Sequence, residues 1–471
     1  MKRRLRVYKK TVSIVNETAT GMYESLVGDK KGFLLESYDK NYDRYTFFGK
    51  EPEEIISSRG NALVITKNDG TEEVRDGNPL ERLKEYYSEF DIVKDNEELS
   101  FSGGLVGNLG YDFVRYAEVL PDNNPDEIGI ETVQMMLMTK FIMVDHVAET
   151  LTGIILGEDT PEGREQSLEE ADALIQQALA NKGRASEKNF THDGVIVNQS
   201  DSLEQYSRKV EKIKEYIREG HIFQTVLSQR WTIETKQSGF ELYKELRELN
   251  PSPYLYYFNY GDFEVIGSSP EMIVKQQGNR VYTCPIAGTR KRGADAEEDA
   301  LLRDELLQDE KERAEHVMLV DLARNDMGRI SEFGTVKVTQ FMEVQNYSHV
   351  MHIVSMVEGR KKGEFHPLDL VSSFLPAGTL SGAPKIRAME IIDELESVRR
   401  GLYGGATGYI DFSGDMDFCI TIRTMIKKGK RVYLQAGAGI VADSIPENEY
   451  QECCNKVMAL AKTLVNVSSP L

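Results

Sequence analysis

Three strand-like runs close together near the end of the chain constrain its fold more than any other feature. Residues 405–412, 416–426 and 431–436 are rich in apolar and β-branched side chains, and only short Ser-Gly-Asp and Lys-Lys-Gly-Lys turns separate them. Strands joined by such short turns pair with their neighbours as an antiparallel meander. The sequence therefore predicts antiparallel sheet toward the C-terminal end of the chain.

Further patterns extend this prediction to the whole chain. The Asn-Asp-Gly turn at 68–70 lies between two strand-like runs and predicts a hairpin, and residues 135–144 predict one buried strand. Hydrophobic spacing predicts helices over 167–180 and 203–217. The predicted fold class is α+β, with large antiparallel sheets forming a two-layer, sandwich-like core flanked by helices. The polar stretch 181–192 predicts a domain boundary.

Composition limits the partners that this chain can have. Its 471 residues suffice for two or three units or one large double-layered body, at roughly 150 residues per domain. The net charge of −20 argues against nucleic acid and anionic membranes, because both reward a basic surface. No apolar run approaches the length of a membrane span. An anionic substrate therefore needs a local cationic pocket or a metal ion.

The four cysteines indicate the redox state of the thiols and the compartment of the protein. Cys284, Cys419, Cys453 and Cys454 show no C-x-x-C spacing, and the last two are adjacent in a helical pattern. This arrangement is typical of reduced thiols and of neither a disulfide framework nor a zinc site. The expected compartment is the cytoplasm.

Two pairs of carboxylates stand out on predicted helices. Glu312 and Glu315 are three residues apart, as are Glu449 and Glu452, so each pair projects from one helix face. Four carboxylates on two helices suit Mg²⁺, which prefers oxygen ligands and keeps several waters. The alternative is two solvated acidic faces in an acidic protein, and the spacing alone favours that alternative.

Other single residues each allow two interpretations. Arg423 lies in an apolar run, where an arginine either binds a ligand or pairs with a core carboxylate. His352 also lies in an apolar run, where a lone histidine is more often a hydrogen-bonded core residue than a catalyst. Thr379 follows a glycine in a loop that is too unlike a Walker A motif to bind a nucleotide. Residues 437–439 (Gly-Ala-Gly) end a strand and form either an anion-binding backbone or a bulge.

Taken together, several ordered motifs resemble those of the chorismate-utilising enzymes, most closely the anthranilate synthase branch. The motifs are PIAGTR, ExxEHVMLVDLARND, YSHVMH, GTLSGAPK, YGGATGY, CITIRT, QAGAGIVADS and ENEYQECCNK. The resemblance covers nearly the whole chain and is densest from about 200 to 464. It implies the chorismate-binding enzyme fold. It also implies a regulatory, amino-acid-binding subdomain over 1–185 and a chorismate-binding catalytic subdomain over 186–471, with interleaved sheets.

Two positions separate the reactions within this family. Aminodeoxychorismate synthases have a nucleophilic lysine where this chain has Ala287, and isochorismate and salicylate synthases have a water-activating lysine where it has Gln224. Both differences imply that ammonia is the nucleophile. The resemblance then implies a lyase that aminates chorismate at C2 and eliminates pyruvate to give anthranilate, the first step of tryptophan biosynthesis.

Three alternatives to this activity remain open. A related aminase stops at 2-amino-2-deoxyisochorismate, and an aminodeoxychorismate synthase component I could have lost its lysine. From a different class, the chain could be a non-catalytic scaffold that senses tryptophan. The identity of the product separates the first two, and Mg²⁺-dependent chorismate binding tests the third.

The resemblance also implies roles for individual residues. Glu315 and Glu452 would be the principal Mg²⁺ ligands, and Glu312 and Glu449 would complete the metal site. Catalysis would use Glu271 as the acid that protonates the leaving C4 hydroxyl, His352 in the second step, and Thr379 to orient the substrate or His352. The residues implied to bind the substrate are Gly288, Thr289, Tyr403, Arg423, Gly437, Ala438, Gly439 and Lys456.

A regulatory site and a partner are implied as well. By analogy Ser37, Pro253, Tyr254 and Leu255 would bind tryptophan as a feedback inhibitor, with Leu255 replacing a common methionine of similar volume. The alternative is a strand with an ordinary proline turn. The chain has no Gly-x-Cys-x-Gly elbow of the glutaminase type, so a separate glutamine amidotransferase subunit (component II) is expected to supply ammonia.

Overall fold

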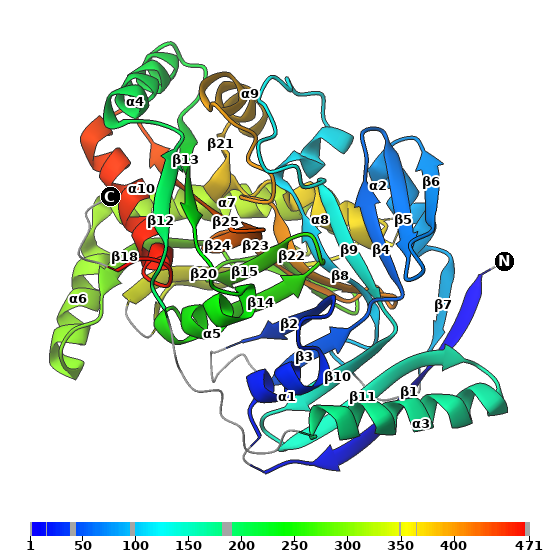
Figure 1. The fold of residues 1–471 in the computed structure, drawn as a ribbon. Helices are drawn as coiled ribbons and strands as arrows, with labels where there is room; N and C mark the ends of the chain where they lie inside the picture. Colours follow the sequence, from blue (N-terminus) through cyan, green and yellow to red (C-terminus); the bar gives the residue numbers. More distant parts are fainter. Residues whose placement is uncertain are drawn as a thin grey trace.

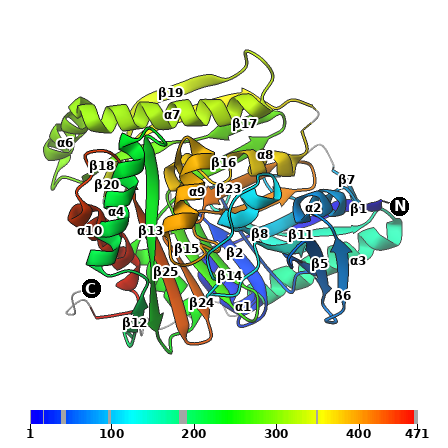
Figure 2. The same ribbon diagram turned by 90° about the horizontal axis from the view of Figure 1, so that it is seen from above.

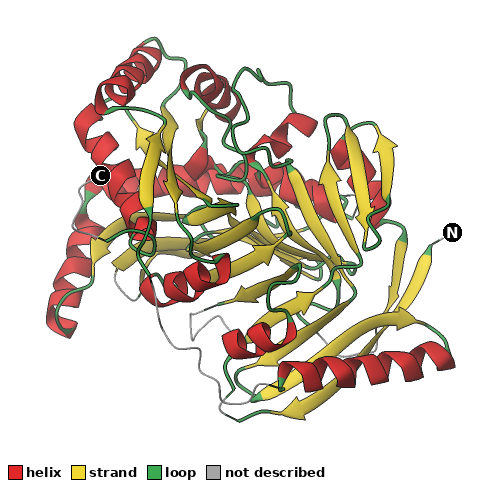
Figure 3. Cartoon of the chain, in the orientation of Figure 1, coloured by secondary structure: helices red, strands yellow, loops and turns green. Residues whose placement is uncertain are grey.

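The computed structural model describes residues 2–15, 17–37, 44–94, 99–180, 191–347, 350–363 and 365–466. Two large β-sheets stack face to face, and helices lie around the outside of the strands (Figure 3). Within the described residues, every strand pairing is antiparallel except the one between β1 (Arg3–Ser13) and β7 (Phe90–Val93). The predicted α+β class with a two-layer antiparallel core is thus confirmed.

The 13-stranded sheet, called sheet A below, draws its strands from both ends of the chain. Neighbour by neighbour it contains β12 (Val195–Gln199), β13 (Gln224–Glu234), β25 (Arg431–Ile440), β24 (Thr424–Lys428), β15 (Glu264–Ser269), β14 (Tyr254–Asn259), β2 (Gly32–Glu36), β3 (Tyr45–Lys50), β10 (Lys140–Asp145), β11 (Thr150–Glu158), β1 and β7, with β21 (Gly382–Ala383) paired to β13.

The 12-stranded sheet, sheet B, is equally mixed. It contains β18 (Ile286–Lys291), β20 (Val350–Arg360), β17 (Arg280–Thr283), β16 (Met272–Gln277), β23 (Met416–Ile420), β22 (Ala406–Asp411), β8 (Gly104–Leu109), β9 (Val133–Met138), β4 (Glu54–Ser58), β5 (Ala62–Lys67) and β6 (Glu72–Asp76), with β19 (Lys337–Asn346) paired to β20. The predicted hairpin at 68–70 joins β5 to β6.

The helices cover the outer faces of the two sheets (Figures 1 and 2). They are α1 (Ala19–Leu26), α2 (Pro79–Tyr87), α3 (Pro161–Ala178), α4 (Leu203–Arg218), α5 (Gly239–Leu249), α6 (Ala296–Gln308), α7 (Glu310–Ile330), α8 (Pro367–Phe374), α9 (Lys385–Leu395) and α10 (Pro446–Ala461), with 3₁₀ turns at Tyr111–Tyr116 and Gly378–Leu380. Across the described ranges, no helix combines the length and the apolar character that crossing a membrane requires.

Alternation along the strands divides the core into layers. Phe33 and Phe47 lie in the cluster between the sheets, whereas their neighbours Leu34 and Phe48 lie in a cluster shared with α1, α3, α4 and α5. A third cluster packs the outer face of sheet B against α2, α7 and α8. This pattern follows from the two-residue period of a strand, which sends successive side chains to opposite faces.

Two predicted strands prove to be two strands each. The run 135–144 breaks at Thr139 into β9 of sheet B and β10 of sheet A, and the run 416–426 breaks into β23 of sheet B and β24 of sheet A. The predicted meander is therefore wrong in one link, because β23 and β24 do not pair. Both strands of each run are buried and therefore apolar. The apolar pattern of the sequence thus continues without interruption where the chain passes from one sheet to the other.

The predicted boundary between residues 185 and 186 lies outside the described residues. Both sheets contain strands from before and after it. The division into a regulatory and a catalytic subdomain stays a prediction.

Candidate functional site

A cavity of about 240 Å³ lies where α7 and α10 meet the ends of both sheets, at β13 and β25 of sheet A and β18 and β20 of sheet B. It brings together residues that are far apart in the sequence. Eleven of the predicted site residues line it: Glu271, Thr289, Glu315, His352, Thr379, Tyr403, Arg423, Gly437, Gly439, Glu452 and Lys456. Gln224 and Ala287, the two positions that distinguish reactions in the family, line it as well.

Glu271 follows β15 and has the properties of an acid that is protonated near neutral pH. Burial raises its pKa to about 8, although the Thr379 hydroxyl and the positive charge of Lys456 act in the opposite direction. The Thr379 Oγ1 atom donates to Glu271 Oε1 across 3.1 Å. The prediction that Thr379 orients the substrate or His352 stays a prediction, and the hydrogen bond that the structure shows goes to the carboxyl group of Glu271.

His352 faces the cavity from β20 in the neutral state. Its Nδ1 lies 2.9 Å from the carbonyl oxygen of Gly288 and 3.1 Å from Thr289 Oγ1. A carbonyl oxygen only accepts, so Nδ1 carries the proton and Nε2 keeps a free lone pair. Burial lowers the His352 pKa, and Arg423 lowers it further against the effect of the Gly288 carbonyl. The ring is thus arranged to accept a proton at Nε2.

The backbone conformation of Gly288 allows this residue to lie beside His352. Its φ of +67° lies in the left-handed region, and a Cβ atom there would be 3.2 Å from Glu312 Oε2. The left-handed backbone of Gly288 thus lies close to the Glu312 carboxylate and brings the Gly288 carbonyl group to His352. Gly288 itself does not line the cavity, but its neighbours Ala287 and Thr289 do.

Arg423 lies at the point where the chain passes from β23 to β24. It adopts a φ of +51°, which turns it out of both strands. Burial lowers the pKa of its guanidinium group, and Tyr403 and Glu452 partly offset this effect. No ion pair of Arg423 is found in the described part of the chain. The alternative of an arginine paired with a core carboxylate is thus not what the fold contains, and a cation faces the cavity instead.

The two carboxylate pairs lie on two helices, and one member of each pair, Glu315 and Glu452, lines the cavity, whereas Glu312 and Glu449 do not. Asp309 caps α7 by accepting from the backbone amides of Lys311 and Glu312, which places Glu312 and Glu315 in its first two turns. Burial raises the pKa of Glu315, and Glu312 and Glu452 raise it further by repulsion. A bound cation would relieve the repulsion between these neighbouring negative charges.

The second pair lies on α10. Burial raises the pKa of Glu449 despite a hydrogen bond from Ser444, and Glu452 adds repulsion. Glu452 forms an ion pair with Lys456 across 2.7 Å. Among the residues that the structure describes, no three His, Cys, Asp or Glu side chains converge as a complete ligand set. Mg²⁺ binding does not require such a set, because this ion often takes one or two carboxylates and completes its shell with water and substrate oxygens.

One face of the β13–β25 pair forms a wall of the cavity. Gly437 and Gly439 lie on this face, where Cβ atoms would come within 3.0 Å of Tyr403 Oη and 2.8 Å of Gln224 Nε2 respectively. Lys456 Nζ donates to the Gly437 carbonyl across 2.9 Å. Ala438 points to the opposite face, into the helix-side core, so only its backbone is available to the site.

Sequence reasoning missed one polar residue of this wall, Gln435. It lies two residues before Gly437 on the same face, and it lines the cavity. The two-residue period counted back from Gly437 and Gly439 would have found it.

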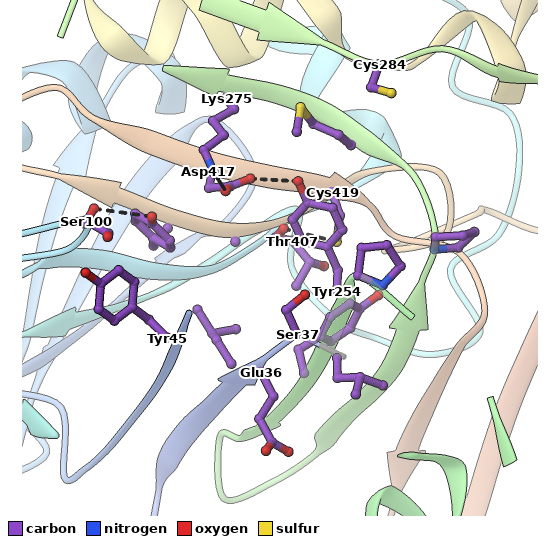
Figure 4. A pocket seen from close by; sticks show the side chains of 18 of the residues that line it. Glu36, Ser37, Tyr45, Ser100, Tyr254, Lys275, Cys284, Thr407, Asp417 and Cys419 are labelled. Carbon is purple, nitrogen blue, oxygen red and sulfur yellow. Dashed lines mark hydrogen bonds and ion pairs between the residues drawn. The ribbon is translucent and has the colours of Figure 1, made fainter. Parts of the chain in front are cut away.

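A second cavity, of about 280 Å³, lies between the two sheets and is shown in Figure 4. All four residues predicted to bind an inhibitor line it: Ser37, Pro253, Tyr254 and Leu255. They come together because β2 and β14 are neighbours in sheet A, with Glu36 opposite Leu255. The buried Ser37 hydroxyl has no hydrogen-bond partner in the described residues, whereas Tyr254 donates to Asp417 across 2.9 Å.

Only a thin wall separates the two cavities. Pro270 and Ile286 line both of them, and they directly precede Glu271 and Ala287 in the sequence. Any occupant of the second cavity therefore lies next to the segment that carries Glu271.

The sequence of this chain is similar to a known protein family and to individual known proteins. A family model described as chorismate binding enzyme matches residues 33–462. The protein named anthranilate synthase component 1 of Acetivibrio thermocellus is 44% identical over 458 residues, covering 95% of this chain and 93% of its own. The protein of the same name from Bacillus subtilis (strain 168) is 42% identical over 450 residues, covering 92% and 87%.

The fold of this chain is also similar to those of solved structures. The crystal structure of anthranilate synthase component I from Streptococcus pneumoniae TIGR4 matches with a TM-score of 0.79 and 39% identity, covering 89% of this chain and 92% of that one. The menaquinone-specific isochorismate synthase of Escherichia coli matches with a TM-score of 0.73 and 17% identity, covering 98% and 95%, which shows a shared fold.

Proposed function

The chain belongs to the chorismate binding enzyme family, and we propose that it is component 1 of an anthranilate synthase, which converts chorismate and ammonia into anthranilate, pyruvate and water. The observation that carries this proposal is the pair Gln224 and Ala287 in the main cavity. Neither side chain can serve as a general base or a covalent nucleophile. The cavity therefore suits an external nucleophile such as ammonia, and relatives named anthranilate synthase component 1 support the proposal.

The reaction can be followed through groups of this chain. Protonated Glu271 donates to the C4 hydroxyl, which leaves as water while ammonia adds at C2. Its pKa of about 8 keeps this proton in place near neutral pH. The free Nε2 of His352 then takes the C2 proton, and the enolpyruvyl group leaves as pyruvate, which aromatises the ring. Arg423, Tyr403 and Lys456 would hold the carboxylates of the substrate.

We propose Mg²⁺ as the cofactor, held by Glu315 and Glu452 with Glu312 and Glu449 beside them. The donor chemistry supports this proposal, since buried and mutually repelling carboxylates favour a hard divalent cation. When bound, Mg²⁺ supplies positive charge for the ring carboxylate of chorismate.

Ammonia is proposed to come from a glutamine amidotransferase subunit, since the sequence contains no Gly-x-Cys-x-Gly elbow. We expect the purified chain with chorismate and Mg²⁺ to form anthranilate with ammonium at alkaline pH, where more of it is free ammonia, but not with glutamine. Anthranilate fluorescence and pyruvate release measure this. Turnover with glutamine alone would refute the need for a partner, and chorismate consumption without fluorescence would favour the 2-amino-2-deoxyisochorismate or aminodeoxychorismate alternative.

The scaffold alternative is tested by the same assay. A scaffold that only senses tryptophan would neither consume chorismate nor bind it in the presence of Mg²⁺. The intact set of Glu271, His352 and Arg423 around one cavity supports catalysis instead.

We propose that tryptophan binds in the second cavity as a feedback inhibitor. Its support is the cavity itself, which collects Ser37, Pro253, Tyr254 and Leu255 and is large enough for an amino acid with an aromatic ring. The shared wall at Pro270 and Ile286 provides contact with the Glu271 segment. The four free thiols fit a reducing compartment, and we propose a cytoplasmic location.

Ser37→Phe tests the regulatory proposal. The larger side chain fills space that the inhibitor needs, so we expect the tryptophan inhibition constant to rise at least about 30-fold, equivalent to about 2 kcal/mol. Ammonium-dependent activity without tryptophan should persist. Ser37→Ala, which enlarges the cavity, is the matched control and should weaken inhibition less. Unchanged inhibition of Ser37→Phe would contradict the assignment.

A further inference from the structure

The wall formed by β13 and β25 contains a buried polar group to which the mechanism above gives no role. In this antiparallel pair, Arg230 lies opposite Gln435 and Ser228 lies opposite Gly437. Directly opposed residues share a face of the sheet, so these side chains lie on the face that carries Gly437 and Gly439. This is the face that lines the main cavity.

The orientation of the Gln435 amide is determined by its neighbours. Arg230 Nε and Nη2 lie 3.1 and 3.0 Å from Gln435 Oε1, and a guanidinium group can only donate. Gln435 Nε2 lies 2.8 Å from Ser228 Oγ. The Ser228 hydroxyl donates its own hydrogen to Glu396 Oε1 across 2.8 Å, so it accepts from Gln435.

One N–H of this amide is left over. The NH₂ group has two hydrogens, and only the bond to Ser228 is found among the described residues. Gln435 lines the main cavity on one side and, on the other, a void of about 10 Å³ that Arg230 and Tyr403 also line. The amide therefore stands between a buried arginine and the space where the substrate would bind.

The arginine behind the amide is a buried cation. Burial lowers the pKa of its guanidinium group, and Glu127, Glu396 and Asp126 only partly offset this effect. Arg230 is 3% exposed, and its Nη1 atom has no hydrogen-bond partner in the described part of the chain. Its one ion pair there is with Glu127, at 3.8 Å. A cation that donates twice to an amide oxygen polarises the amide and strengthens its N–H as a donor. An anionic ligand in the cavity would benefit from this arrangement.

We propose that Gln435 is a substrate-binding residue that donates its second amide N–H to a carboxylate oxygen of the substrate, beside Tyr403 and Arg423, and that Arg230 is the positioning residue that orients and polarises it. This inference rests on the proposed function, because it takes an anionic substrate such as chorismate. In a chain with a net charge of −20, it adds a buried source of positive potential to Arg423 and Lys456.

Gln435→Met, which keeps the volume but removes the amide, tests the proposal. A hydrogen bond to a charged group corresponds to about 10-fold or more in affinity. We expect the chorismate KM with ammonium as nucleophile, and the chorismate Kd measured by calorimetry with Mg²⁺ but without ammonia, to rise by about that factor. The kcat should change less, because the contact exists before any bond is broken.

Gln229→Met is the matched control. Gln229 lies on β13 opposite Ala436, is buried at 1% exposure as against 7% for Gln435, and points to the opposite face. It should leave the KM and Kd within about two-fold of the wild type. A Gln435→Met protein with KM and Kd within about two-fold of the wild type would overturn the proposal.

Two further outcomes are distinguishable. If Gln435→Met does not fold, Gln435→Glu repeats the test. The glutamate still accepts from Arg230 but presents an oxygen where the wild type has the N–H, so chorismate binding should weaken by more than the factor expected for Gln435→Met. Chorismate binding equal to that of the wild type would overturn the proposal. If the wild type binds chorismate but makes no anthranilate, the proposed function fails, while the ratio of the Kd values still decides the role of Gln435.

Discussion

Replacing Glu271 by glutamine is expected to lower kcat with ammonium by a factor of about 10² to 10⁴, the usual contribution of a positioned acid. Glutamine has the shape of the protonated carboxyl group and can still accept from Thr379, but it has no acidic proton to give to the C4 hydroxyl. The chorismate KM should change little, because the variant keeps the volume of the cavity. Steady-state anthranilate formation measures both constants.

The pH dependence gives a second readout of the same group. Glu271 must be protonated to act, and its pKa is about 8, so kcat/KM should fall as the pH rises through 8. The fraction of free ammonia rises over the same range, so the profile must be measured at a constant concentration of free ammonia. A profile that stays flat through pH 8 in the wild type would contradict the assignment of Glu271 as the acid.

The stability of the protein should respond to the same proton. The pKa of Glu271 is raised above its unfolded value, so the folded state binds this proton more tightly than the unfolded chain does. The resulting stabilisation is complete below the unfolded value and is lost as the pH rises toward 8. Glu271→Gln has no proton to lose, so its Tm should fall less than that of the wild type over this range.

The second large effect is expected for Glu315→Gln. Removal of one negative charge from the carboxylate pairs should weaken Mg²⁺ binding and lower kcat/KM by about a thousand-fold, equivalent to about 4 kcal/mol of lost transition-state stabilisation. Calorimetric titration with Mg²⁺ gives a readout besides activity. The loss of affinity should appear both with and without chorismate.

The control for this effect lies on the other carboxylate helix. Glu447→Gln removes the same charge from the exposed first turn of α10, away from the cavity, and should leave Mg²⁺ affinity unchanged. Equal Mg²⁺ affinity in the wild type and in Glu315→Gln would contradict the assignment of Glu315 as a ligand. The pairs would then be solvated acidic faces, the alternative that the spacing by itself favoured.

Local patterns were sufficient for several elements. The hairpin at 68–70 depends on a turn of three residues, and the helices that carry the carboxylate pairs depend on the 3.6-residue period. Motif resemblance then selected most of the residues that line the cavity. Each of these patterns depends on residues that are close together in the sequence, so it can be recognised without the tertiary structure.

Tertiary structure alone decided how distant residues meet. Thr379 donates to Glu271 over a separation of 108 residues, and Gln435 is held by Arg230 over 205. It also decided that the runs 135–144 and 416–426 each divide between sheets A and B, which turns Arg423 into the cavity. The sequence by itself determined the faces, the turns and the chemistry of the side chains. It did not determine which faces pack together, because that choice depends on the burial and pairing of strands from the whole chain.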